Sequence, residues 1–134
     1  MNFKNIKFYC VTNKEVNFIK KNQYNLCWVG EQVAPNNYLT CNSGNNIYYK
    51  EKYYSELTFH YWYWKNLLQY ENNNQWVGFC QKRRFWIKEK SNNLINQDNI
   101  NNFLITEPLN DWSNYQAIIC KQIKVSGAKK IKII

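Results

Sequence analysis

Residues 75–84 read Gln-Trp-Val-Gly-Phe-Cys-Gln-Lys-Arg-Arg, and this stretch decides the fold class. Its apolar part predicts a buried strand over residues 75–80, because strands covered on both faces form nearly continuous apolar runs. Four polar residues follow at the carboxyl end of that strand. Open α/β sheets bind ligands at the carboxyl ends of their strands. The stretch therefore predicts an α/β protein with a basic ligand site after this strand.

Three further stretches predict strands around it. Residues 4–11 become continuously apolar toward their end, and the polar loop Thr12-Asn13-Lys14 follows them. Residues 27–30 and 115–120 read as a short strand and a buried strand. Loops after a first strand often meet a nucleotide. This loop lacks a glycine-rich fingerprint, so the sequence supports neither the usual dinucleotide-binding motif nor a P-loop.

Residues 55–70 predict the clearest helix. Ser55 is a candidate N-cap, and Glu56 in the first turn suits the positive end of the helix. We expect His60 to be a polar residue of the helix surface rather than a catalytic base, since the spacing places no nucleophile beside it. Apolar residues recur at i, i+4, i+7 and i+11, which predicts a stripe packed on the core, namely Leu57, Tyr61, Trp64 and Leu68.

The segments between these elements give weaker signals. Residues 16–26 fit either a short helix or a loop. Residues 34–46 are rich in Pro, Asn, Ser and Gly and predict an irregular loop, with turns at residues 36–37 and 44–46.

Length and composition bound the class of protein. The chain has 134 residues, and 45% of them are hydrophobic, which suffices for one folded domain and argues against a disordered chain. No apolar run has the length of a membrane span, and the first residues lack the apolar core of a secretory signal. The net charge is +9, but the excess of Lys and Asn is typical of AT-rich coding sequence. Charge alone therefore does not establish a polyanionic partner.

The five cysteines are widely spaced and odd in number. No pair forms a Cys-x-x-Cys motif, which argues against a disulfide framework and a zinc knuckle. We expect reduced thiols in a cytoplasmic protein, several of them in the core.

The basic residues after the strand predicted over residues 75–80 are the clearest candidates for ligand binding. In a chain that otherwise uses lysine, both arginines stand together as Arg83 and Arg84, directly after Lys82. A guanidinium pairs bidentately with phosphate, so the stretch fits a diphosphate-binding site. A basic surface turn or an interface ion pair is the alternative. No Asp-x-Asp motif is present, so the sequence identifies no ligands for a divalent metal such as manganese.

Several stretches together resemble one bacterial family. Its pattern runs Gly-Asp/Asn-Asn-Ile, Glu-Leu-Thr, Tyr-Trp-x-Trp-Lys-Asn, and then a strand ending in Gly-Leu-x-His-Tyr-Arg-Arg-Tyr-Phe. The chain matches this order and spacing at residues 44–47, 54–58, 61–66 and 76–86. The family is built on a domain of unknown function. Its members are regarded as glycosyltransferases of capsular and surface polysaccharide synthesis.

The resemblance implies a GT-A-like, Rossmann-like half domain with a nucleotide-sugar site. Thr12, Asn13 and Lys14 would border the nucleotide, while Lys82, Arg83 and Arg84 would face the diphosphate. Glu56 would hydrogen-bond sugar hydroxyls or pair with an arginine. Gln81-Lys82 replaces the His-Tyr that usually precedes the arginine pair, and Tyr115-Gln116 replaces a later Tyr-Asp. These departures are typical of a divergent branch.

Three functions are therefore carried forward. The first is transfer of a sugar from a nucleotide-sugar donor to a glycan acceptor, in the cytoplasm at the inner face of the membrane, with peripheral membrane contact. Residues 1–134 would form the N-terminal part of a longer transferase, and we expect this part alone to be inactive. The second is a basic binding module for an anionic polymer, although no nucleic-acid motif is present. The third is a non-catalytic fragment, which the apolar ending at residues 131–134 suggests.

Overall fold

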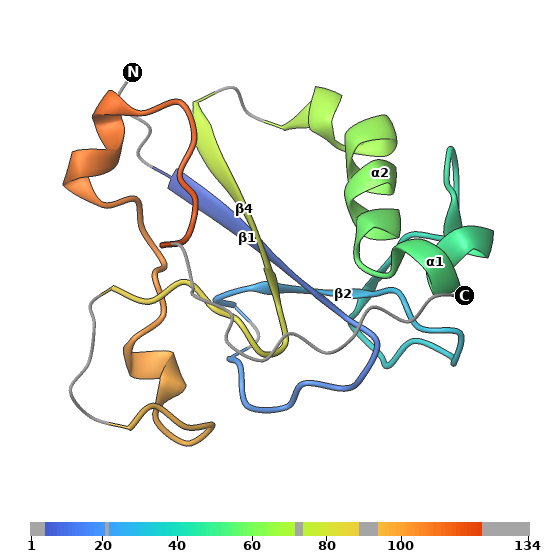
Figure 1. Ribbon diagram of the computed structural model, residues 1–134, viewed down its shortest axis with the longest axis horizontal. Coiled ribbons are helices and arrows are strands. Elements are labelled where there is room, and N and C mark those ends of the chain that lie inside the picture. Colours follow the sequence, from blue (N-terminus) through green and yellow to red (C-terminus); the bar gives the residue numbers. More distant parts are fainter. Residues whose placement is uncertain (1–4, 21, 72–73, 89–93, 122–134) are drawn as a thin grey trace, which may run out of the picture.

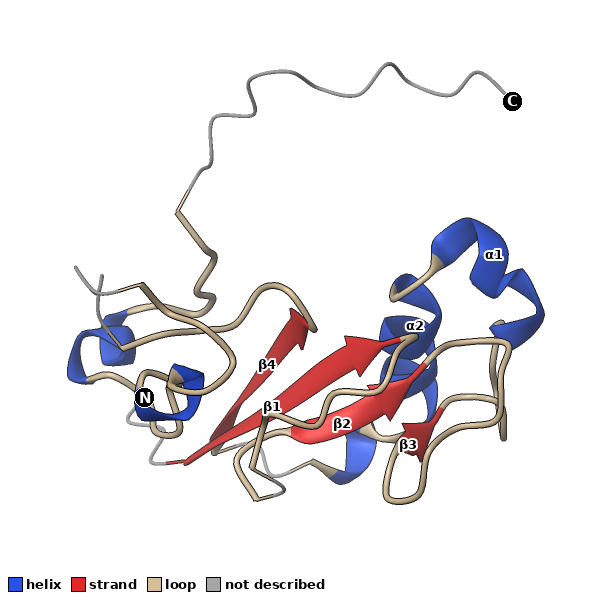
Figure 2. Cartoon of the chain, turned by 90° about the horizontal axis from the view of Figure 1, so that it is seen from below, coloured by secondary structure: helices blue, strands red, loops and turns tan. Residues whose placement is uncertain are grey.

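The computed structural model describes residues 5–20, 22–71, 74–88 and 94–121. A four-stranded sheet with parallel pairing throughout forms its centre, in the order β3-β2-β1-β4 (Figures 1 and 2). After β1 the chain places β2 and β3 on one side, and then returns to place β4 on the other side of β1. The direction of winding thus changes between β1 and β4, as in a Rossmann-like α/β sheet. The strands are β1 (Asn5–Thr12), β2 (Asn25–Trp28), β3 (Leu39–Thr40) and β4 (Gln75–Gln81).

The central strand β1 is covered on both faces, as the apolar run predicted. Phe8 and Cys10 join the core on one face of the sheet, whereas Tyr9 and Val11 join the core on the other face. Gly78 of β4 lies opposite Phe8 in the register. A Cβ atom added at Gly78 would lie 2.3 Å from Cε1 of the Phe8 ring, so the close packing of this ring needs glycine.

One face of the sheet is covered by helices (Figure 1). The main helix α2 lies between β3 and β4 in the chain and packs its buried residues against Tyr9, whose ring centroid is 5.0 Å from that of Tyr63. The helical layer consists of η1 (Tyr48–Lys50), α1 (Glu51–Tyr54), α2 (Leu57–Asn66) and η2 (Leu68–Tyr70).

The predicted core stripe of this helix is wrong. Leu57 and Trp64 are 54% and 56% exposed, and Leu68 is also exposed. The helix carries aromatic residues on both sides, so apolar periodicity could not select the buried side. The residues that actually pack on the sheet are Thr58, Phe59, Trp62 and Tyr63.

The opposite face of the sheet is covered by irregular chain. Loops and the short helices η3 (Ile100–Asn102) and η4 (Asn110–Asn114) pack over Phe8 and Cys10. The buried Tyr24 hydroxyl donates hydrogen bonds to the carbonyl oxygens of Trp86 and Ile105, at 3.3 and 3.2 Å. Such bonds hold segments far apart in the sequence together without regular secondary structure.

The strand predictions had mixed outcomes. The strands predicted over residues 4–11 and 75–80 are confirmed as β1 and β4, although most of β4 is half-buried rather than buried. The strand predicted at residues 27–30 is β2, shifted toward the N-terminus. Residues 115–120 form no strand, so that prediction is wrong; Ile119 is 86% exposed and makes no sheet pairing. Within the described part of residues 16–26 the chain bends without a helix before β2 begins.

The turn predictions in the loop over residues 34–46 agree with the backbone. Asn37 and Gly44 both have positive φ angles, 71° and 59°, which turn residues such as Asn and Gly adopt readily. The two-residue strand β3 interrupts the otherwise irregular chain.

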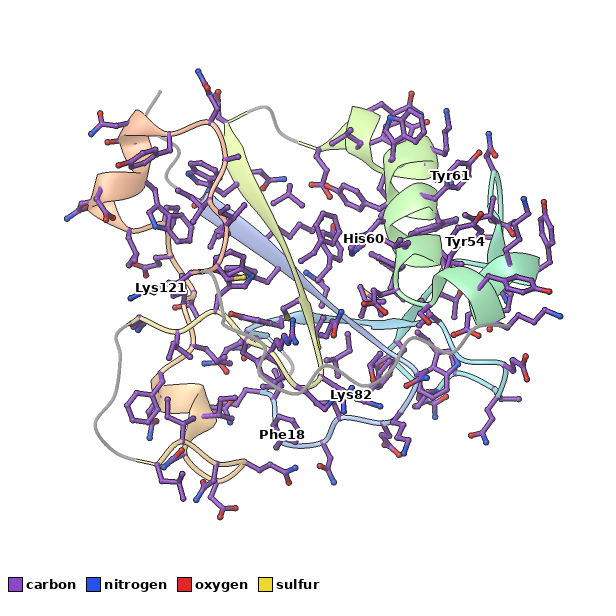
Figure 3. All side chains as sticks on the ribbon, viewed as in Figure 1. Phe18, Tyr54, His60, Tyr61, Lys82 and Lys121 are labelled. Atoms are coloured by element: carbon purple, nitrogen blue, oxygen red, sulfur yellow. The ribbon has the colours of Figure 1, made fainter. Side chains whose placement is uncertain are left out.

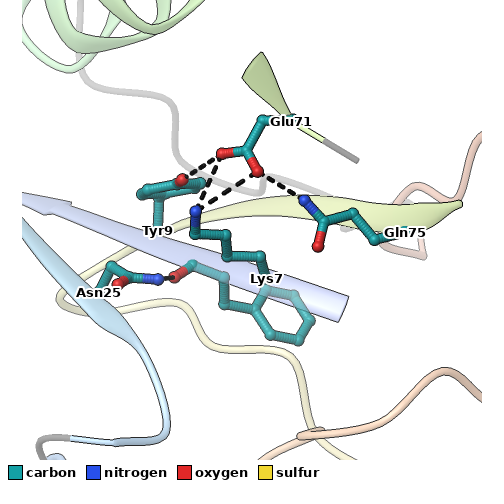
Figure 4. Close-up of polar contacts among 6 residues, drawn as sticks. Lys7, Tyr9, Asn25, Glu71 and Gln75 are labelled. Atoms are coloured by element: carbon teal, nitrogen blue, oxygen red, sulfur yellow. Dashed lines mark hydrogen bonds and ion pairs between the residues drawn. The ribbon is translucent and has the colours of Figure 1, made fainter. Parts of the chain in front are cut away.

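Glu71 ties the end of the helical layer to the sheet (Figure 4). Its carboxylate accepts hydrogen bonds from the Tyr9 hydroxyl at 2.7 Å, the Lys7 ammonium at 3.1 Å and the Gln75 amide at 2.5 Å. We call these four side chains the Glu71 cluster. Burial acts to raise the pKa of Glu71, but the bonds from Tyr9, Lys7 and Gln75 outweigh it and lower the pKa below its usual value.

All five cysteines are free. Cys10, Cys27, Cys41 and Cys80 are buried, which confirms the expectation of core thiols, and Cys120 is exposed. Within the described ranges, no helix is long and apolar enough to cross a membrane.

Candidate functional site

A cavity of about 520 Å³ lies at the carboxyl ends of β1, β2 and β4, where the winding of the sheet changes direction. Figure 3 labels Lys82 at this edge of the sheet. Open α/β sheets place their ligands in such a crevice. Six of the seven residues predicted as a site line it, whereas Arg84 does not. The six are Thr12, Asn13, Lys14, Glu56, Lys82 and Arg83.

Thr12 shapes the first wall of the cavity. Its hydroxyl donates to the carbonyl oxygen of Lys14 at 2.6 Å and accepts from the Lys14 amide at 3.0 Å. Its own carbonyl oxygen accepts from the Val29 amide at 3.0 Å, which fixes the loop beside the end of β2. The buried Thr12 side chain therefore holds the turn, while the exposed side chains of Asn13 and Lys14 remain at its surface.

A tight turn after β4 forms the second wall. The Arg84 amide donates to the Gln81 carbonyl oxygen at 2.9 Å, so Lys82 and Arg83 occupy the tip of the turn. The Lys82 ammonium donates to the Asn13 side-chain oxygen at 3.0 Å and thereby joins the two loops.

Lys14, Lys82 and Arg83 converge at this edge, and none of them forms an ion pair with a carboxylate among the described residues. Partial desolvation, followed by repulsion from Lys14 and Arg83, lowers the pKa of Lys82. The one ion pair in the described part of the chain joins Lys7 to Glu71, near the other end of β4. Like charges held together cost free energy unless an anion compensates them, so the cavity is suited to an anionic ligand.

Two carboxylates line the same cavity. Glu56 stands just before α2 and accepts a hydrogen bond from the Gln81 side-chain amide, rather than pairing with Arg83 or Arg84. The sequence analysis missed the second one, Glu51 of α1, which also lines the cavity. Burial and then repulsion from Glu31 raise the pKa of Glu51. Its position five residues before Glu56 was the signal available in the sequence.

The backbone between these carboxylates is strained. Ser55, a lining residue, has φ 46° and ψ −122°, a conformation that costs a residue with a side chain about 1–3 kcal/mol. The prediction that Ser55 is the N-cap of α2 is wrong, because Glu56 occupies that position. Its carbonyl oxygen instead accepts from the Thr58 amide and hydroxyl, at 3.1 and 2.6 Å.

His60 lies beside the cavity rather than in its lining. Its ring packs on Phe79 of β4 with a centroid distance of 4.5 Å. Burial lowers the pKa of His60, and the nearby Glu56 opposes this effect. The His60 ring is half-buried, so its surroundings are less polar than those predicted for a residue of the helix surface.

The described residues do not provide a set of protein ligands for a metal. No three His, Cys, Asp or Glu side chains in the part of the chain that the structure describes lie close enough to share an ion. Glu51 and Glu56 both line the cavity, but no third potential ligand among the described residues completes a metal site with them. We therefore assign no metal ligands and derive no chemical step through manganese or another cation.

The fold and the cavity define an α/β protein with an open parallel sheet and a crevice lined by cationic side chains at its switch point. The family described as "Domain of unknown function (DUF4422)" matches residues 7–132, which is most of the chain. The chain belongs to this family, whose description states no activity. Neither the curated proteins nor the solved structures gave a match.

Proposed function

We propose that this protein binds the diphosphate of a nucleotide sugar in the basic cavity and serves sugar transfer to a glycan acceptor. The observation that carries the proposal is the convergence of Lys14, Lys82 and Arg83 at the switch point of the sheet. The motif resemblance over residues 44–86 supports the same function.

The chemistry of sugar transfer suits this arrangement. When the bond between the sugar and the diphosphate breaks, negative charge builds up on the departing phosphate oxygen. Cations placed at that oxygen stabilise the transition state more than the ground state. Arg83 can pair with two phosphate oxygens at once, while Lys82 and Lys14 act as point charges. Arg84 has no such role in this proposal, since it lies outside the cavity lining.

The carboxylates would act on the sugar rather than on the phosphate. Glu56 accepts from Gln81 and retains acceptor capacity for a sugar hydroxyl. Glu51 stands in the same cavity with a raised pKa, so it is closer to exchanging protons near neutral pH than an exposed carboxylate.

Calorimetric titration with UDP and GDP, each with and without manganese, tests the proposal. We expect saturable binding to the wild-type chain. A Lys82→Ala/Arg83→Ala variant should bind at least tenfold more weakly, because hydrogen bonds to charged groups contribute about 1.5–3 kcal/mol each. Arg84→Ala is the matched control, since it removes an adjacent arginine that does not line the cavity, and it should change the affinity less than twofold.

The alternative is a basic module that binds an anionic polymer, which the net charge of +9 favours. Polymer binding would fall steeply with salt and would respond similarly to Arg83→Ala and Arg84→Ala. The transferase proposal is overturned if a folded chain binds neither nucleotide, or if the two arginine variants weaken nucleotide binding equally.

A further inference from the structure

The helix α2 is apolar on the side that faces away from the sheet. Leu57 and Trp64 are 54% and 56% exposed, and the half-buried Tyr61 shares their helical spacing. Figure 3 shows Tyr61 on α2. The neighbouring helix α1 adds Tyr53 and Tyr54, 68% and 47% exposed. We call these five side chains the aromatic face. A helix that is apolar all round is normally buried, so this face requires an explanation.

Two lysines of α1 and α2 lie over rings of the aromatic face. The Lys65 ammonium lies 3.5 Å from the centroid of the Trp64 ring, and the Lys52 ammonium lies 4.9 Å from that of Tyr53. The acids of the same segment, Glu51 and Glu56, are turned toward the cavity, which both of them line. The outer surface of α1 and α2 therefore presents aromatic rings and lysines, while the acids of the same segment line the cavity.

We propose that the aromatic face adsorbs to an anionic lipid surface. Tyr and Trp prefer the interface between lipid and water, where the ring is buried and its polar atom stays wet. Lysines beside the rings are attracted by anionic headgroups, and their alkyl chains can extend along apolar surface. Aromatic rings are also common at protein–protein interfaces, but lysine is depleted there, so the lysines over the rings favour an anionic lipid surface over a protein partner.

The mode of contact is adsorption rather than insertion across the bilayer. α2 has 10 residues, about half of the length that spans a membrane. Its other side is occupied by the sheet through Phe59, Trp62 and Tyr63, so only the outer side is available to lipid. The segment that separates α1 from α2 also lines the cavity, so adsorption would hold the cavity close to the lipid surface. The inference stands without the proposed function.

Sedimentation with vesicles tests the proposal. We expect the wild-type chain to bind vesicles of phosphatidylcholine mixed with phosphatidylglycerol, and to bind pure phosphatidylcholine vesicles far more weakly. Lys52→Gln/Lys65→Gln should weaken binding to the anionic vesicles by about 25-fold, since each lysine near an anionic surface contributes about 1 kcal/mol, or fivefold. Lys20→Gln/Lys121→Gln removes the same charge from exposed positions elsewhere and should change binding less than threefold.

A second pair of variants tests the apolar part of the contact with lipid. Tyr53→Ser/Trp64→Ser should weaken vesicle binding at least tenfold, because burying an aromatic side chain contributes about 1.5–3 kcal/mol. Leu94→Ser/Ile119→Ser changes two side chains that are each 86% exposed and lie outside the helical layer, and it should leave binding unchanged. Circular dichroism checks that each variant is folded.

Tryptophan fluorescence tests whether the aromatic face itself contacts the lipid. Trp64 is the exposed indole among the described residues, so brominated lipids should quench it on binding. Trp64→Phe should bind with little loss and lose most of the quenching. The proposal is overturned if the folded chain does not bind anionic vesicles, or if the control pairs weaken binding as much as the aromatic-face variants do. It is also overturned if sedimentation velocity shows a dimer that the aromatic-face variants dissociate while neither form binds vesicles.

Discussion

The two ends of β4 carry charged side chains in opposite arrangements. At the start of β4, the Glu71 cluster surrounds one carboxylate with three donors from β1 and β4 (Figure 4). At the end of β4, Lys14, Lys82 and Arg83 line an open cavity and repel one another. A charge whose partners all belong to the protein contributes to folding. Cations that have no carboxylate partner among the described residues are available for an anionic ligand.

The largest expected effect is the loss of stability in Glu71→Ala. Tyr9 is 1% exposed, and the substitution leaves its hydroxyl without the acceptor at 2.7 Å. We expect a loss of about 2–4 kcal/mol in the free energy of unfolding, because several hydrogen bonds to a charged group are removed together. Urea denaturation measures this free energy. Glu107→Ala, at an exposed position, is the control and should cost less than about 0.5 kcal/mol.

The same carboxylate should make stability depend on acidity. Its pKa is lower in the folded protein than in the unfolded chain, so its contribution is complete above the unfolded pKa. That contribution is lost as the pH falls through the lower folded pKa. Glu71→Gln should therefore show a shallower loss of stability on acidification than the wild type. Equal slopes in urea titrations at a series of pH values would place the source of acid sensitivity elsewhere.

The cationic end should respond differently to the removal of charge. Lys82→Ala/Arg83→Ala removes charges that repel Lys14, so the free energy of unfolding should stay within about 0.5 kcal/mol of the wild-type value or rise at low salt. Thermal unfolding at low and high salt measures this. A loss above about 1 kcal/mol would mean that these residues stabilise the fold like the Glu71 cluster, and the contrast between the two ends of β4 would disappear.

Glu51 should give the smallest effect, with the sign opposite to that of Glu71. Its folded pKa is raised, so the ionised form is disfavoured in the native state above that pKa. Glu51→Gln should slightly raise the melting temperature at neutral pH. The gain should vanish as the pH falls and the wild-type carboxyl takes up its proton. A lower melting temperature at neutral pH would show that the ionised carboxylate has a stabilising partner.

Sequence reasoning found the parallel sheet and the edge of it that carries the cavity for a physical reason. Parallel strands buried on both faces leave long apolar runs, and the rule on strand ends then brings residues 12–14 and 82–83 to one edge. Arg84 lies outside the cavity lining because the tight turn places Lys82 and Arg83 at its tip. Sequence rules for a four-residue turn do not tell which of the two arginines lines the cavity.

The errors came from segments in which several arrangements satisfy the same composition. In α2 both sides are aromatic, so the choice of Phe59, Trp62 and Tyr63 for the core depends on their packing against Tyr9 and Phe79. Residues 115–120 have the composition of a strand, yet the described part of the chain provides no ladder for them. Burial of strands and helices is a tertiary property that local sequence does not determine.

The reactivity of the cysteine thiols can report when the native structure opens. Native chain should accept one alkylating group, at Cys120, whereas the four buried sulfurs react only when the sheet separates. Because Cys10, Cys27 and Cys80 lie in β1, β2 and β4, peptide mapping of the labels would show whether adjoining strands come apart in one event or in succession.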